Sequence, residues 1–320
     1  MCIKLYGMDK NIEQRIKLLK EKYDTIDQDL ETQLDGLLYS KPITYWDYIQ
    51  TDALLNLQVQ RTGFKDEMVF IMYHQINELI FKMIRWEIEQ IAHHENLTTK
   101  FFTERLMRIS RYFDMLTASF TIMGDGMERE QYAKFRDTLT PASGFQSAQY
   151  RLIEFCSTEL INLIDYRFRS KIDRNTAFEN AFEHLYWQAA GKDYKTGKKS
   201  FLLEQFEKKY KTEFLSIMKE YNTINLWSKF KSLPEKDKEN IDLINAMRHL
   251  DYCINIKWVM SHYEAAGKYI ATQDEATGGS DWRKYMHPKY QKRIFFPDLW
   301  SKEEFENWGV TNLEAYKILT

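Results

Sequence analysis

One histidine occupies a helical position at which its side chain could bind a cofactor. His262 follows Trp258 by four residues and precedes Ala265 by three, a spacing that predicts an apolar helix face. A buried imidazole needs partners for both ring nitrogens. The helix alone leaves two interpretations open: a core histidine bonded to a neighbour, or an axial ligand of haem iron. Because no CxxCH segment occurs, such a haem would be bound noncovalently.

A second histidine and an arginine could act on a bound molecule. His74 lies one turn after Phe70, so the two side chains should share a helix face, which is equally compatible with a structural role. Arg136 lies one turn after Tyr132. An arginine beside aromatic residues is suited to hold a carboxylate through two parallel hydrogen bonds. A surface ion pair of Arg136 with Glu128 or Glu130 is the alternative, and it also stays open.

A pair of glycines follows the last long hydrophobic segment, in Thr277-Gly278-Gly279-Ser280. Adjacent glycines cost backbone entropy, and a folded chain usually keeps them where main-chain amides approach another group closely. A plain helix-terminating turn is the alternative.

Other catalytic motifs are missing from the sequence. It contains no GxGxxG, GxxxxGK[ST], GxSxG or HExxH segment, which removes the main support for phosphate-loop and hydrolase chemistry. Helical di-iron sites use Glu-x-x-His pairs, and no histidine here has Glu three residues before it. The histidines are His74, His93, His94, His184, His249, His262 and His287.

The composition indicates which elements must position these residues. Only 12 Gly and 5 Pro occur in 320 residues, about 5% against about 12% in average proteins. Since folds built from hairpins need turn residues, long helices fit better. Hydrophobic residues make up 44% of the chain, with 20 Phe, 20 Tyr and 8 Trp, so a core can form. We predict an all-α fold, with a large helical core and a smaller peripheral helical segment.

Hydrophobic spacing predicts long helices over residues 67–89, 103–122, 147–166 and 236–270. Residues 1–40 should form an N-terminal helical arm. We expect segments 41–166 and 236–320 to build the large core, which under the haem interpretation of His262 would bind haem and substrate. Residues 167–235, rich in Lys, Glu and aromatics, are predicted to be a peripheral helical insertion.

Charge and hydrophobicity exclude some partners. With 45 basic and 47 acidic residues the net charge is −2, so no nucleic acid partner is expected. No apolar run approaches the roughly 18 residues of a membrane span, and the charged start does not resemble a signal peptide. The three cysteines, Cys2, Cys156 and Cys253, are far apart and odd in number. We therefore predict a reduced, cytoplasmic protein without a membrane partner.

Five blocks of the sequence, in order, resemble the tryptophan 2,3-dioxygenase family across most of the chain. The third block is the longest and most specific. The blocks are Tyr45-x-x-Tyr48 with Asp52-Ala53-Leu54-Leu55-x-x-Gln58; Asp66-Glu67-Met68-x-Phe70-Ile71-x-x-His74-Gln75; Tyr132-x-x-Phe135-Arg136-x-x-Leu139-x-Pro141-x-Ser143-Gly144-Phe145-Gln146-Ser147 with Gln149-Tyr150-Arg151; Thr277-Gly278-Gly279-Ser280; and Phe295-Phe296-Pro297-Asp298-Leu299-Trp300.

The resemblance implies a helical, homotetrameric protein with noncovalent haem b. It implies oxidative opening of the indole ring of L-tryptophan by O2 to N-formylkynurenine, a step of tryptophan catabolism in the kynurenine pathway. A haem monooxygenase or dioxygenase of the same fold acting on a substituted indole, and a helical binding protein without catalysis, are the alternatives.

The resemblance also implies a role for each matching residue. His262 corresponds to the axial iron ligand, and His74 to the catalytic residue that meets the indole N–H. His249, which follows an arginine, ranks second as iron ligand. The substrate pocket would be formed by Tyr45, Tyr48, Phe70, Tyr132, Arg136, Leu139 and Thr277, the first two lent by a neighbouring subunit, and the cofactor would also contact Ser143 and Gly278.

Overall fold

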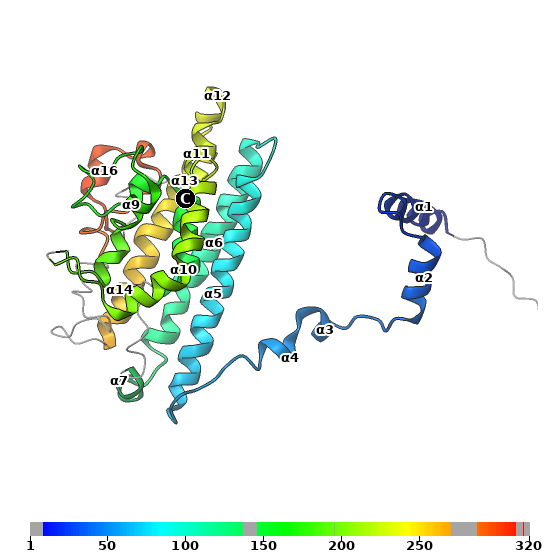
Figure 1. Cartoon of the computed structure of the whole chain (residues 1–320), viewed down its shortest axis with the longest axis horizontal. Coiled ribbons are helices and arrows are strands. Elements are labelled where there is room, and N and C mark those ends of the chain that lie inside the picture. The colour runs from blue at the N-terminus through cyan, green and yellow to red at the C-terminus, as the bar shows by residue number, and fades with distance from the viewer. Residues whose placement is uncertain (1–8, 137–145, 195, 270–286, 312–315, 317–320) are drawn as a thin grey trace, which may run out of the picture. The chain divides into compact units, whose positions relative to one another are not determined.

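The computed structural model describes residues 9–136, 146–194, 196–269, 287–311 and 316. In these ranges the chain is helical and contains no strand, only two isolated β-bridges, which join Ile164 to Leu185 and Lys192 to Lys199 (Figure 1). The predicted all-α fold is confirmed. None of the described helices combines the length and apolar composition that a bilayer crossing demands.

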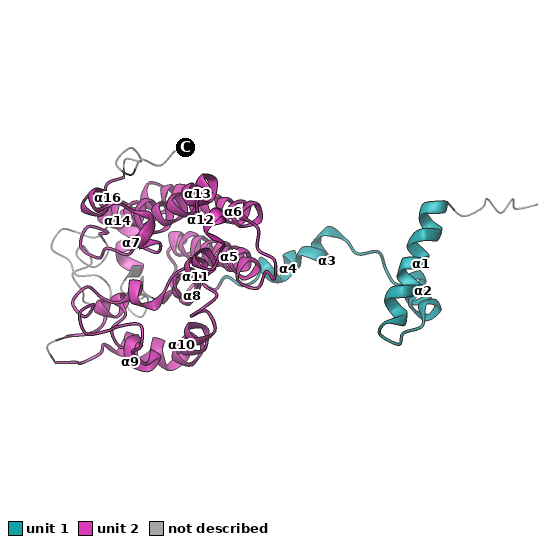
Figure 2. Cartoon of the chain, turned by 90° about the horizontal axis from the view of Figure 1, so that it is seen from above, with its two compact units in different colours: residues 1–58 teal, residues 59–320 magenta. Residues whose placement is uncertain are grey.

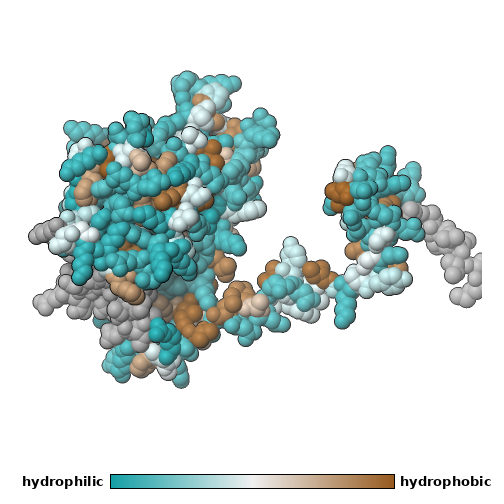
Figure 3. Space-filling view, in the orientation of Figure 1, coloured by the Kyte–Doolittle hydropathy of each residue, from teal (hydrophilic) through white to brown (hydrophobic). Residues whose placement is uncertain are grey.

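The chain divides into two compact units, residues 1–58 and 59–320 (Figure 2). Unit 1 contains α1 (Lys10–Asp24), α2 (Leu30–Tyr39), α3 (Tyr45–Ile49) and α4 (Thr51–Leu54). Asp9, Asp29 and Thr44 cap the first three helices through their side-chain oxygens. No residue of these helices is buried within the unit, and Figure 3 shows hydrophobic residues on its surface.

Unit 2 is built around long helices that lie side by side in Figure 1. Their bounds are α5 (Lys65–Ala92), α6 (Thr99–Gly124), α13 (Ile241–Tyr252) and α14 (Trp258–Tyr269), with α7 (Arg129–Arg136) and α8 (Ala148–Ser157) beside α5. Helix α6 packs against α5, α13 and α14 and buries Leu106, Ile109 and Phe113 completely. At about 25 cal/mol per Å² of buried apolar surface, such contacts dominate the stability of the bundle.

The remaining elements of unit 2 are shorter, apart from one helix. They are η3 (Leu160–Leu163), α9 (Phe178–Phe182), η4 (Tyr186–Ala190), α10 (Phe201–Glu220), α11 (Leu226–Lys231), α12 (Glu235–Lys238), η6 (Pro297–Leu299) and α16 (Lys302–Glu306). Helix α10 packs against α8. Phe182, Trp187 and Phe214 are completely buried and belong to the same hydrophobic core as the long helices.

The helix predicted over residues 147–166 is shorter than expected. Helix α8 ends at Ser157, because Thr158 takes an extended conformation and its hydroxyl donates a hydrogen bond to the carbonyl of Phe295, at 2.5 Å. The contact crosses 137 residues of sequence. A side-chain bond to a distant backbone group therefore ends this helix, and local hydrophobic spacing carries no sign of it.

The helix predicted over residues 236–270 is also interrupted. It begins at Ile241, and a π-helical turn, η5 (Cys253–Lys257), separates α13 from α14. From Leu250 to His262 is a step of 12 residues, which in a regular α-helix turns the side chain about 120° away from the starting face. A π turn accommodates one additional residue. It therefore brings His262 back toward the face that carries Leu250.

Candidate functional site

His262 lies on α14 among aromatic rings. Its imidazole stacks on Phe120, with ring centroids 5.3 Å apart and an interplanar angle of 12°, and lies 5.6 Å from Trp258. Within the described residues, neither of its ring nitrogens has a hydrogen-bond partner. Burial lowers the pKa of His262 to about 4, with smaller contributions from His74 and Arg293. The ring is therefore neutral at pH 7, the form that binds a metal ion.

His74 lies on α5 with one ring nitrogen occupied. Its Nδ1 is 2.7 Å from the carbonyl oxygen of Phe70. Because a carbonyl can only accept, Nδ1 must carry the proton, and in the neutral ring Nε2 is then an acceptor. Burial lowers the pKa of His74, which favours that neutral ring. The residue still has an exposed surface, so Nε2 can meet a donor from outside the protein.

The two imidazoles are close enough to interact. A positive charge on His74 lowers the pKa of His262, although the residues belong to different helices. Rings of α5 and α6 connect them: Tyr73 lies 5.3 Å from His74 and 6.3 Å from Phe120, which stacks on His262. The packing of α6 against both α5 and α14 thus brings the histidines to one aromatic centre.

Helix α7 joins this centre through α5. The backbone N–H of Glu128 donates to Asp66 at 2.6 Å, which holds the two helices together. The ring of Tyr132 then lies 6.3 Å from Phe70 and 4.8 Å from Tyr269 of α14. Arg136 is the last residue of α7, and its backbone is described without its side chain. The rings of Phe70 on α5, Tyr132 on α7 and Tyr269 on α14 therefore lie close to one another.

Six other predicted site residues belong to unit 1 or to segments outside the described residues. Leu139, Ser143, Thr277 and Gly278 lie outside the described residues. Tyr45 and Tyr48 belong to α3 in unit 1, where their side chains are 72% and 74% exposed.

On the other side of Trp258 lies a buried network of charged groups. The ring of Tyr150 stacks on Trp258 at 4.8 Å. Next to it, Glu154, Arg151, Arg293 and Tyr186 form what we call the Glu154 network. Its tyrosine hydroxyl donates to the glutamate at 2.5 Å and accepts from both arginines.

Two residues of the centre, Phe120 and Tyr269, and Arg293 of the Glu154 network were not predicted as site residues. Phe120 and Tyr269 fitted the hydrophobic spacing of their helices and were indistinguishable there from core residues. Arg293 stands two positions before Phe295, the first residue of an apolar motif. A charged residue next to such a motif is the one signal that could have drawn attention to it.

His249 occupies a different environment. Its ring lies 3.7 Å from the sulfur of Cys253, and the charges that act on it come from Asp114 and Lys257. These two residues form an ion pair of 2.6 Å between α6 and η5. The structure thus gives His249 no place beside His74. The described residues hold no group of three or more His, Cys, Asp or Glu side chains arranged for a metal ion.

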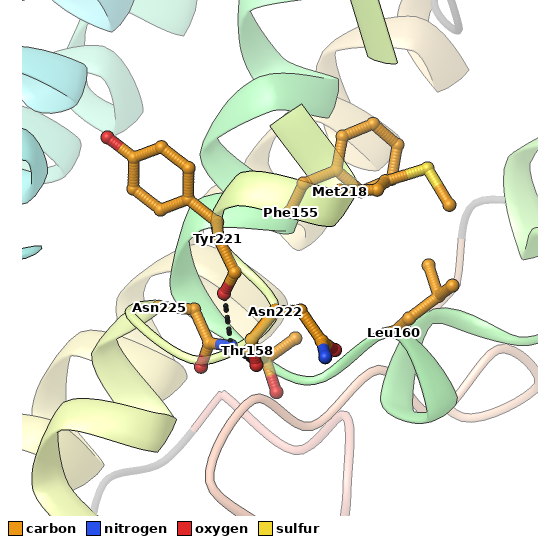
Figure 4. A pocket seen from close by; sticks show the side chains of 7 residues that line it. All are labelled: Phe155, Thr158, Leu160, Met218, Tyr221, Asn222 and Asn225. Carbon is orange, nitrogen blue, oxygen red and sulfur yellow. Dashed lines mark hydrogen bonds between the residues drawn. The ribbon is translucent and has the colours of Figure 1, made fainter. Parts of the chain in front are cut away.

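A small cavity lies between α8, α10 and the segment that follows α10 (Figure 4). Its volume of about 10 Å³ holds at most one water molecule. The lining residues are Phe155, Thr158, Leu160, Met218, Tyr221, Asn222 and Asn225, none of which is a predicted site residue. This cavity is therefore too small for an amino acid.

Fold and site together define a class of protein, an all-helical one in which long helices bring two neutral histidines to an aromatic centre. Comparison with known proteins gives the family. The model of the family described as tryptophan 2,3-dioxygenase matches residues 31–244. The chain belongs to the tryptophan 2,3-dioxygenase family.

Individual relatives match over a shorter length. The chain is similar to the tryptophan 2,3-dioxygenase of Ruegeria sp. (strain TM1040), with 38% identity over 119 residues, 37% of this chain and 42% of the relative. For the Xenopus tropicalis protein the identity is 39% over 125 residues, 35% of this chain and 30% of the relative. For the Ralstonia pickettii protein it is 37% over 128 residues, 39% of this chain and 44% of the relative.

The matches cover the candidate site in part. Each covers less than half of the relative's own length. The family match includes His74 and Arg136, whereas His262 and Thr277 lie beyond its end at residue 244. For His262, the structural contacts therefore carry more weight than the comparison does.

Proposed function

We propose that the protein is a haem-dependent dioxygenase that opens the indole ring of L-tryptophan between C2 and C3 with O2, to give N-formylkynurenine. The observation that carries the proposal is the pair of neutral imidazoles, His74 and His262, brought to one aromatic centre in a chain of this family. Haem b would be the noncovalent cofactor.

The residues around His262 fit a haem. Its imidazole is neutral and half-buried, and among the described residues it has no hydrogen-bond partner, so its ring is available to an iron atom. The neighbouring Nε1 of Trp258 is buried without an acceptor in the same part of the structure. Unpaired buried donors are rare, which supports the presence of a further group at this place. When bound, haem supplies the activation of dioxygen.

The residues of the chain would bind and orient the substrate. Nε2 of His74 would accept a hydrogen bond from the indole N–H, because Nδ1 is held by the Phe70 carbonyl. The rings of Phe70 and Tyr132 would flank the indole and exclude water, which strengthens each polar contact inside the site. No transfer of the indole proton is needed for this role, since positioning alone lowers the barrier.

The amino acid end of the substrate would be held by residues that the sequence identifies. We propose Arg136 as the partner of the carboxylate and Thr277 as a partner of the ammonium group, with Leu139 at the pocket wall and Ser143 and Gly278 at the haem edge. Tyr45 and Tyr48 would be contributed by a neighbouring subunit of a homotetramer, which is supported by their exposure within unit 1. We expect this assembly in the cytoplasm.

The test is an absorption spectrum of the full-length, haem-loaded ferrous protein before and after addition of L-tryptophan in air, with the product identified by mass. The proposal expects a Soret band and a product with two added oxygen atoms and an opened ring. One added oxygen with the ring intact would instead support a monooxygenase. Absence of a Soret band after supply of haem would support a binding protein.

A matched pair of variants tests the role of His74. His184 has the same local geometry, with Nδ1 2.9 Å from the carbonyl of the residue four positions earlier, but it packs on Phe168. His74→Phe should lower kcat while the Soret band is retained, and His184→Phe should leave kcat unchanged. Equal kcat in wild type and His74→Phe would contradict the assignment.

A further inference from the structure

The outward faces of two long helices in unit 2 differ in chemistry. After its first residue, α10 exposes only polar or charged side chains, as a helix that faces water should. Helix α5 instead exposes five large apolar residues, which we call the α5 stripe. They are Met72 (41% exposed), Ile76 (44%), Leu79 (48%), Met83 (47%) and Trp86 (64%). A contiguous apolar surface on a globular chain usually marks an interaction site, whereas single exposed apolar residues do not.

The spacing of the α5 stripe is that of a helix pair. Its residues follow one another at intervals of four, three, four and three positions, the repeat through which two helices pack side by side. At 1.5 Å per residue the stripe is about 21 Å long. On the opposite side of the same helix, Phe81, Ile84 and Ile88 are buried in the core. A helix that is apolar on both sides is normally covered on both sides.

Helix α6 extends the apolar surface beside the stripe. It runs in the opposite direction to α5, because Tyr112 bonds Glu87 near the end of α5 and Phe120 lies 6.3 Å from Tyr73 nearer its beginning. Interpolation between these two contacts places Met115 of α6 beside the middle of the stripe. This residue is 58% exposed. The apolar surface therefore belongs to two adjacent helices.

We infer that a second copy of this chain packs on the α5 stripe, with the two α5 helices antiparallel and a two-fold axis at Leu79. The stripe is symmetric about this residue, since Met72 precedes it and Trp86 follows it by seven positions. The axis sets Leu79 against its own copy and Met72 against the partner's Trp86. A thioether sulfur against an aromatic ring is a favourable contact, and the symmetry forms it twice.

The size of the surface suits a contact between copies. The exposed parts of the five residues amount to roughly 100 Å² each, so two stripes would bury about 1,000 Å² in total, the lower bound for a specific interface. Trp86, the most exposed member, is of a residue type that often dominates the binding energy of interfaces. The stripe would form one interface of the homotetramer proposed above, so this inference rests on that part of the proposed function and not on haem or substrate.

The first experiment measures the mass of the full-length protein in solution by light scattering. Leu79→Glu places two carboxylates against each other at the axis, so the mass should fall to half of the wild-type value or less. Phe201→Glu is the control, because Phe201 is 70% exposed on α10, outside the stripe, and its mass should equal that of the wild type. Circular dichroism checks that both variants keep their helices.

The second experiment tests the antiparallel arrangement by oxidative cross-linking between copies, with the wild type as background. Leu79→Cys should give a disulfide-linked pair, because the axis brings the two sulfurs together. Met72→Cys should not, because residues seven positions from the axis lie about 21 Å from their own copies, far beyond the reach of a disulfide. In a parallel pair both variants would cross-link.

Several results would overturn the inference: a monomeric wild type, an unchanged mass in Leu79→Glu, or a disulfide-linked pair in Met72→Cys. Leu79→Cys without a disulfide between copies would also overturn it, because something other than a second copy would then cover the stripe. Mass and cross-linking need neither haem nor tryptophan. Failure of the proposed chemistry therefore leaves both measurements unaffected, and failure here leaves the Soret and product tests unaffected.

Discussion

Two networks of the same composition lie in different parts of unit 2. Each consists of one glutamate, two arginines and one tyrosine. In the network centred on Glu87, the carboxylate lies 3.1 Å from both Arg105 and Arg108 and accepts from the hydroxyl of Tyr112 at 3.2 Å. These residues connect α5 to α6. The Glu154 network has the same types of contact but connects α8 to segments far away in the sequence.

The difference is the access of water. The side chain of Arg108 is 50% exposed, whereas that of Arg293 is 8% exposed. Water screens the first network and permits its arginines to separate from the carboxylate at little cost. In the second network the carboxylate and both guanidinium groups are buried, so the charges remain paired. The same residue types therefore form a network with one exposed arginine in one place and a fully buried network in the other.

The largest effect should come from substitution of His262. The rings of Trp258 and Tyr150 connect this histidine to the Glu154 network. His262→Ala should lose the haem, since it removes the imidazole that we propose as the iron ligand at the aromatic centre. The measurement is the ratio of Soret to protein absorbance after reconstitution. His249→Ala should retain the haem, and a haem-replete His262→Ala protein would refute the ligand assignment.

The next effect concerns the glutamates. Glu154→Leu should lower the free energy of unfolding by about 3–5 kcal/mol, because it leaves two buried arginines without their carboxylate. Glu87→Leu should cost less, about 1–3 kcal/mol, because Arg108 can turn toward water. Urea denaturation of both variants gives the values. Equal losses of stability in the two variants would show that the different burial of the two networks does not affect their contribution.

The pH dependence of the free energy of unfolding should report the burial of His262. His262 has a folded pKa of about 4, below the ordinary value of 6.5, so the unfolded chain binds its proton more tightly. Stability should therefore fall as the pH decreases from 6.5 to 4, by at most about 3 kcal/mol. His262→Phe should lack this part of the loss, measured as free energies of unfolding in the haem-free protein.

The buried carboxylate of Asp251 changes stability with pH in the opposite direction to His262. It does so in both the wild type and His262→Phe. Burial raises the pKa of Asp251 to about 6, so its folded state holds the proton more tightly, and this stabilisation is lost as the pH rises through 6. Because Asp251 is present in the wild type and in His262→Phe, its contribution cancels in the difference. Parallel pH profiles of the two proteins would contradict the shifted pKa of His262.

The smallest effect should be found at the exposed end of the Glu87 network. Arg108→Ala should change the free energy of unfolding by no more than about 0.5 kcal/mol, since exposed ion pairs contribute little. Thermal unfolding of this variant beside Arg105→Ala is the measurement. A loss from Arg108→Ala larger than that from Arg105→Ala would show that exposure does not decide the strength of these pairs.

Much of the fold was predictable because it depends on local spacing. The helices containing Phe70 and Phe113 repeat their apolar residues every three or four positions, and the structure extends them by only a few residues. The end of α8 was not predictable. The Thr158 hydroxyl at that end donates a hydrogen bond to the carbonyl of a residue 137 positions away. The π turn before Trp258 also depends on how two helix faces meet, which periodicity alone does not specify.

The sequence by itself determined which residues could do chemistry: His262 on an apolar face, His74 one turn after Phe70, and the ordered blocks that resemble one family. Only the tertiary structure decided that linked aromatic rings connect these imidazoles, that Nδ1 of His74 is occupied, and that Arg293 is buried beside Glu154. The physical reason is that spacing along a helix sets the direction of a side chain, whereas the charges and rings around it come from other segments, and their influence depends on how much water the packing removes.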